Sequence, residues 1–132
     1  MSSHRTNRSA VAVFFFSLLT LLASPAAFAQ SDAVARMAGI LADMQHFPSD
    51  EQKQTLAAIS NDDSNSEATR TIATAIHNIQ HKAQPDDVAA LKNVENSVAA
   101  TEAEKKLASI VLGFHHMAGD EAKKTLGMLA NK

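Results

Sequence analysis

The chain has 132 residues, with 12 Lys or Arg and 14 Asp or Glu, so its formal net charge is −2. It contains no cysteine, which excludes disulfides, thiolate metal sites, thiol catalysis and haem attached through cysteine. The acidic balance argues against nucleic acid and anionic membranes as partners, because both require a basic surface.

The first 29 residues have the three parts of a cleavable signal peptide. Arg5 and Arg8 form a basic start, an apolar run follows over 11–23, and the Ala-Phe-Ala sequence at 27–29 precedes Gln30. The apolar run is shorter than the ~20 residues that a membrane-spanning helix needs. We therefore predict an exported protein, periplasmic or secreted, with no membrane span after cleavage.

Residues 30–132 then form a mature chain of one small domain. Removal of Arg5 and Arg8 leaves ten basic and fourteen acidic residues, a net charge of −4. Without disulfides, the stability of such a domain outside the cytoplasm has to come from packing.

The mature chain repeats itself with a period of 35 residues, and the register holds twice without a gap. Identical residues recur at His46, His81 and His116, at Leu56, Leu91 and Leu126, and at Asn61, Asn96 and Asn131. Apolar character recurs at Met37, Ile72 and Leu107, at Leu41, Ile76 and Val111, and at Met44, Ile79 and Phe114. We therefore predict repeats at about 32–66, 67–101 and 102–132.

Each repeat has the pattern of two helices. The first has apolar residues at the helical spacing of 37, 41 and 44, and the second starts with a capping signature, Ser49 and Gln52 in the first repeat. This predicts helices at about 32–47, 50–61, 67–82, 86–96, 102–117 and 120–131, and no strand. The fold class expected is all-α, with three tandem helical hairpins of ~35 residues. A short α-solenoid-like array, which we favour, and a six-helix bundle both fit this pattern.

The repeated histidines are the main candidates for function. In the predicted helices, His46, His81 and His116 lie in the last turn and off the apolar stripe. The simplest interpretation is structural: a histidine there binds free carbonyl groups and complements the negative end of the helix dipole. A second is a pH sensor, because imidazole ordinarily titrates between pH 5 and 8.

The third interpretation of the histidines is a transition-metal site. His77 and His81 are four residues apart, so one helix would present both to one ion, and His115 and His116 occupy the matching place in the next repeat. Histidines of two adjacent helices could converge, but we expect that those of all three repeats cannot share one ion. Asp43 or Asn78 could add an oxygen ligand.

No motif of an enzyme is present: the sequence lacks a nucleophile elbow, a phosphate-binding glycine loop and a zinc-hydrolase helix. We therefore predict a non-enzymatic protein without a cofactor that binds a peptide or protein partner, as an adaptor or chaperone-like protein, because helical repeats build extended binding faces. The candidate face carries the three repeated histidines with Gly39, Thr74 and Ser109. The alternative is a histidine-based metal-binding protein.

Overall fold

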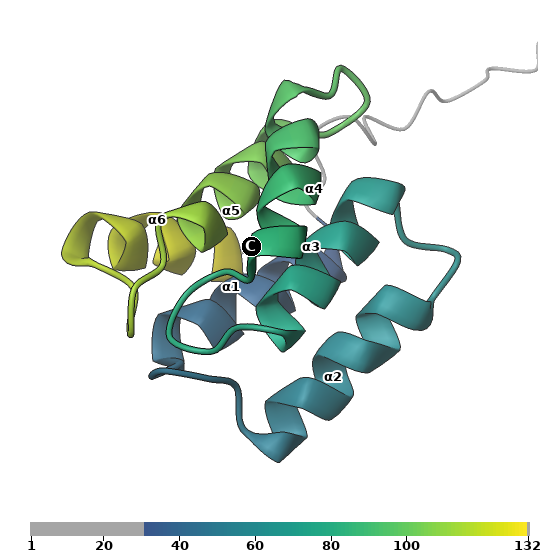
Figure 1. Ribbon diagram of the computed structural model, residues 1–132. Helices are drawn as coiled ribbons and strands as arrows, with labels where there is room; N and C mark the ends of the chain where they lie inside the picture. Colours follow the sequence, from purple (N-terminus) through teal and green to yellow (C-terminus); the bar gives the residue numbers. More distant parts are fainter. Residues whose placement is uncertain (1–30, 132) are drawn as a thin grey trace, which may run out of the picture.

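The computed structural model describes residues 31–131, which form six α-helices and no strand (Figure 1). The predicted signal peptide therefore lies outside the described residues. The helices are α1 (Asp32–Asp43), α2 (Asp50–Asn61), α3 (Glu67–His77), α4 (Pro85–Asn96), α5 (Glu102–Leu112) and α6 (Asp120–Ala130). The prediction of an all-α fold is confirmed. None of these helices is long and apolar enough to cross a membrane.

The helices begin where the sequence places capping residues. The side chains of Ser31, Ser66 and Thr101 accept hydrogen bonds from the backbone N–H groups of Val34, Thr69 and Glu104, at the starts of α1, α3 and α5. These bonds satisfy N–H groups that have no partner within the first turn of the helix. Ser49 and Gln52 form a full capping box at the start of α2.

The first helix of each repeat ends earlier than predicted. The predicted ends were 47, 82 and 117, whereas α1, α3 and α5 end at Asp43, His77 and Leu112. Met44, Ile79 and Phe114 follow these ends and are still buried, so the apolar pattern extends past the helix. Periodicity alone therefore overestimates the length of these helices.

Each second helix packs mainly against the first helix of another repeat. The largest helix–helix contacts join α2 to α3, α4 to α5 and α6 to α1, and the contacts of α1 with α2 and of α5 with α6 are much smaller. Helices α1, α3 and α5 also contact one another. Since α6 packs against α1, the first and last repeats touch and the arrangement closes on itself, unlike an open array (Figure 1).

One hydrophobic core runs through all six helices. Its fully buried members include Met37, Ile72 and Leu107 on the first helices and Leu56, Leu91 and Leu126 on the second helices. These are the apolar positions that recur with the 35-residue period. The repeated pattern therefore specifies equivalent core positions in each repeat.

Candidate metal centre

The three repeated histidines lie in the loops that follow α1, α3 and α5. His46 is three residues past the end of α1, and His81 and His116 are each four residues past the ends of α3 and α5. They are the only non-glycine residues among the described ones with a positive φ, at 64°, 66° and 61°. This left-handed backbone region costs a residue with a Cβ about 1–2 kcal/mol.

The backbones of these histidines form a closed ring of hydrogen bonds. The N–H of His46 donates to the carbonyl of His116, that of His81 to the carbonyl of His46, and that of His116 to the carbonyl of His81, at N···O distances of 2.5, 2.6 and 2.6 Å. Short antiparallel pairings between Gln45 and Met117 and between Lys82 and His115 add to the ring. The three loops therefore hold one another in place, and each repeat contributes one third of the structure.

The imidazole rings meet above this backbone ring. Their centroids are 5.0–5.3 Å apart in edge-to-face pairs. The Nδ1 atoms of His81 and His116 are 3.2 Å apart, and each histidine offers a nitrogen within 4.8 Å of a nitrogen of the other two. No carboxylate or further histidine among the described residues belongs to this group. We name His46, His81 and His116 the tri-histidine cluster.

The two sides of the cluster differ. Two residues before each histidine, Met44, Ile79 and Phe114 are at most 2 % exposed, so the chain packs tightly toward the core. The histidines themselves are exposed, as are Phe47 and Met117 next to them. An ion at the cluster would thus be held against the protein on one side and be open to solvent on the other.

Only two of the four histidines predicted as metal ligands, His81 and His116, come together in the structure. The assumption that His77 and His81 lie on one helix is wrong, because α3 ends at His77. His77 instead lies beside Asn78, whose side-chain oxygen is 3.2 Å from its Nδ1, and His115 is exposed in the loop before His116. We also expected that the histidines of all three repeats could not share one ion. The structure places nitrogens of His46, His81 and His116 within 4.8 Å of one another, so distance does not keep the three apart.

The helix-cap interpretation is wrong as well, because none of the three histidines lies in the last turn of a helix. For the same reason they do not share a helix face with Gly39, Thr74 and Ser109, which lie on α1, α3 and α5. Of the predicted oxygen ligands, Asn78 donates to Asp87 at 3.1 Å, and Asp43 is the last residue of α1. Neither belongs to the cluster.

The recurrence of histidine at 46, 81 and 116 is itself a signal for this site. Three identical residues at one period become three equivalent positions when the repeats close into a ring, and equivalent positions near the axis of a ring converge. An open array, which we favoured over a six-helix bundle, separates them by the distance between neighbouring helices, ~8–10 Å.

A buried polar group lies at the other end of the first helices. Glu104, which is 4 % exposed, accepts hydrogen bonds from Thr69 Oγ1 (2.7 Å), from the Thr101 N–H (2.7 Å) and from Ser66 Oγ. Burial raises the pKa of its carboxyl, but these hydrogen bonds outweigh burial, so the pKa lies below its ordinary value. Each oxygen of this carboxylate has a partner, so the group joins α3 to α5 and is no free ligand.

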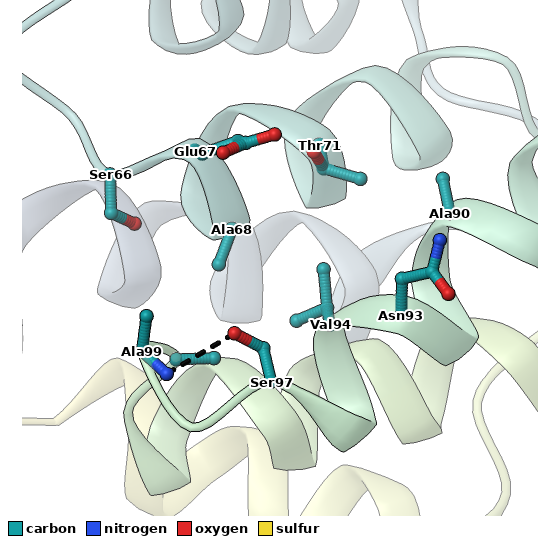
Figure 2. A pocket seen from close by; sticks show the side chains of 10 residues that line it. Ser66, Glu67, Ala68, Thr71, Ala90, Asn93, Val94, Ser97 and Ala99 are labelled. Atoms are coloured by element: carbon teal, nitrogen blue, oxygen red, sulfur yellow. Dashed lines mark hydrogen bonds between the residues drawn. The ribbon is translucent and has the colours of Figure 1, made fainter.

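A separate cavity of about 270 Å³ lies between the start of α3 and the end of α4 (Figure 2). Small and polar side chains line it, among them Ala68, Thr71 and Asn93, and the Ala99 N–H donates to Ser97 Oγ at its edge. Glu67 is the one ionisable residue in its lining, so this cavity offers no pair of acid and base groups.

Comparison with known proteins gives no guide to this site: no protein-family model, no curated protein and no solved structure matches the chain.

Proposed function

We infer that this protein binds a transition-metal ion through the tri-histidine cluster. One observation carries the proposal: histidine occupies, in all three repeats, a left-handed backbone position that glycine would occupy at lower cost, and the three side chains converge. Backbone strain of this kind is found mainly where the side chain has a function. Equivalent residues that meet at one point then supply three imidazole ligands.

The cluster has the chemistry and dimensions of a metal site. Neutral imidazole is a common ligand of zinc, copper and nickel. At Zn–N distances of about 2.0–2.1 Å, two nitrogens 3.2 Å apart subtend roughly 100–106° at the ion, close to a tetrahedral angle. The third imidazole has a nitrogen within 4.8 Å of nitrogens of the other two, and its side chain is exposed.

The proposal changes the order of the two functions that the sequence suggested. A histidine-based metal-binding protein, periplasmic or secreted, now comes first. Binding of a peptide or protein partner stays a prediction, supported by Phe47 and Met117, which are 58 % and 45 % exposed beside the cluster. Neither function requires an enzyme, and non-enzymatic binding remains the proposal.

The test is metal binding by the protein produced from the full-length sequence and purified without chelators. Intact mass gives the first residue of the exported chain, and equilibrium dialysis against micromolar zinc, copper, nickel and cobalt gives the stoichiometry. We expect one ion per chain. His81→Asn should weaken binding by at least about 100-fold, because it removes one of three ligands while asparagine tolerates the positive φ.

The matched controls are His77→Asn and His115→Asn, which remove histidines outside the cluster. Both variants should bind metal as the unaltered protein does. Equal loss of binding in a control and in His81→Asn would contradict the proposal, and so would the absence of retained metal in the folded, unaltered protein.

A further inference from the structure

The tri-histidine cluster leaves part of the coordination shell of an ion unfilled. The group contains three imidazoles and no fourth side chain of the described residues. Zinc and cobalt usually take at least four ligands, and protein sites with three ligands keep a position for water or another small molecule. This inference rests on the proposed function and concerns what fills that position.

The unfilled position faces solvent. Met44, Ile79 and Phe114, two residues before each histidine, are buried, and hydrogen bonds join the backbones of the three histidines to one another. The histidines themselves are exposed. A small molecule can therefore reach the ion from outside without any movement of the backbone ring.

The net charge of the ion and its three histidines determines which kind of ligand binds best in the open position. Three neutral imidazoles do not compensate the two positive charges of a divalent ion, and no carboxylate belongs to the group. Lys82, which follows His81 directly and is exposed, adds a positive charge next to the cluster. An anion in the open position would reduce this excess of positive charge, whereas a neutral ligand would not.

We propose that the ion at the tri-histidine cluster keeps one solvent-facing coordination position, and that this position binds a small monodentate anion. The anion is exchangeable, because all three histidines of the cluster are exposed. The protein thus presents a positively charged metal centre to anionic ligands, either free anions or the carboxylate of another molecule.

The competing occupants are His115 and a second copy of the chain. His115 is next to His116, yet its nitrogens are outside the group of converging ligand atoms. A second copy could face the first and contribute its own three histidines, which would give an ion with six imidazoles and no open position. Both occupants predict results that differ from those for an open position.

The experiment uses the Co²⁺-loaded protein and sodium azide as the anion. We expect the visible spectrum of cobalt to change on addition of azide with saturation at one azide per cobalt, and native mass spectrometry to show one chain per ion. His115→Asn should leave the azide titration unchanged, and Lys82→Ala should weaken azide binding by about 2- to 5-fold, as the loss of one exposed charge predicts. Addition of acetate should displace azide if carboxylates are also ligands.

The outcomes separate this inference from the proposed function. Failure to retain cobalt contradicts the proposed function itself. Retention of cobalt with a spectrum that azide does not alter contradicts only the open position. In that case, two chains per ion identify a second copy as the occupant, and a spectrum that responds to azide only in His115→Asn identifies His115.

Discussion

Histidine at positions 46, 81 and 116 has a backbone conformation that glycine adopts without cost. If only the backbone conformation of the loops mattered, the folded protein would be more stable with glycine than with histidine by about 1 kcal/mol at each position. The edge-to-face contacts between the rings offset some of this cost. A function of the side chains would explain why histidine occupies these positions despite the cost that is left.

Replacement of the three histidines by glycine should therefore abolish metal binding without lowering the stability of the metal-free protein. We expect His46→Gly, His81→Gly and His116→Gly together to leave the free energy of unfolding of the metal-free protein unchanged or to raise it by up to about 2 kcal/mol. Thermal and urea unfolding in chelator measure this. Metal should raise the melting temperature of the unaltered protein but not of the variant.

The alanine variants serve as the comparison. Alanine removes the imidazole but keeps the Cβ and its cost at positive φ, so the triple alanine variant should be less stable than the triple glycine variant. If alanine and glycine variants are equally destabilised, the imidazole contacts stabilise the loops more than the backbone strain costs, and a structural role explains the histidines.

The contribution of Glu104 to the stability of the fold should depend on pH. Glu104→Gln removes a buried, hydrogen-bonded carboxylate and should cost about 1–3 kcal/mol at pH 7. Because the pKa of Glu104 is lower in the folded chain, its contribution is fully present above the ordinary pKa near 4.5 and is lost as the pH falls through the lowered value. The difference in melting temperature between variant and unaltered protein should thus shrink between pH 5 and pH 3.

Glu102→Gln is the control for that measurement. Glu102 lies in the same first turn of α5, but it is exposed and pairs only with Lys105 at 3.5 Å. Its replacement should change stability by less than about 0.5 kcal/mol. A difference for Glu104→Gln that stays constant down to pH 3 would mean that the charge of the carboxylate does not contribute.

At the scale of elements, the starts of helices were easier to predict than their ends. Serine, threonine, proline and acidic residues mark the starts, and the side-chain hydrogen bonds at Ser31, Ser66 and Thr101 form there. Asn78 and Gly113 directly follow α3 and α5 and are residue types common at helix ends, but Met44 follows α1 and gives no such signal. The backbone leaves the helix there because the loops bind one another across repeats, and a local pattern contains no information about that contact.

The second helices differ in how well their first turn is capped. Ser49 caps α2 through a side-chain hydrogen bond, whereas Gly119, at the same place before α6, has no side chain to do so. A Cβ at Gly119 would meet no atom within 4 Å, and φ there is −70°. Gly119→Ser should therefore stabilise the protein by about 0.5–1 kcal/mol, measured by urea unfolding, and Ser49→Ala should destabilise it by about 1 kcal/mol. Equal stability of Gly119→Ser and the unaltered protein would show that α6 needs no cap.

At the scale of the whole molecule, the sequence indicated the all-α class and most of the core, but not the packing of α6 against α1. Apolar positions such as Leu56 and Leu91 are buried as predicted, since helical periodicity defines which face packs. Which helix packs on which could not be predicted, because a repeat that stacks in an open array and one that closes with two others have the same apolar pattern. The tri-histidine cluster was missed for that reason.

Closure predicts that the chain tolerates circular permutation. The end of α6 packs with α1 as the end of α2 packs with α3, where residues 62–65 form the connection. A protein in which a copy of residues 62–65 joins 131 to 31, and which is opened within 62–65, should keep its helix content, and its stability should change by about 1 kcal/mol or less. Circular dichroism measures the helix content and urea unfolding measures the stability, and cobalt binding should be retained.

The comparison is the same joined protein with its new chain ends at the peptide bond between Gln45 and His46. Its ends interrupt the backbone ring at His46, so it should keep most of its helices but lose metal binding. If both permuted proteins unfold, the contact between α6 and α1 does not close the molecule in solution.

The buried carboxylate of Glu104 illustrates what covalent connection of the repeats permits. The equivalent residues are Val34 and Thr69, and all three are buried. In an assembly of three separate identical subunits, a glutamate at this place would occur three times, and three buried carboxylates would repel one another. A single chain can mutate each copy independently, so that one glutamate meets a threonine, while the histidines at the opposite end stay identical. One chain can thus have interior residues that differ between repeats and still present three identical histidines.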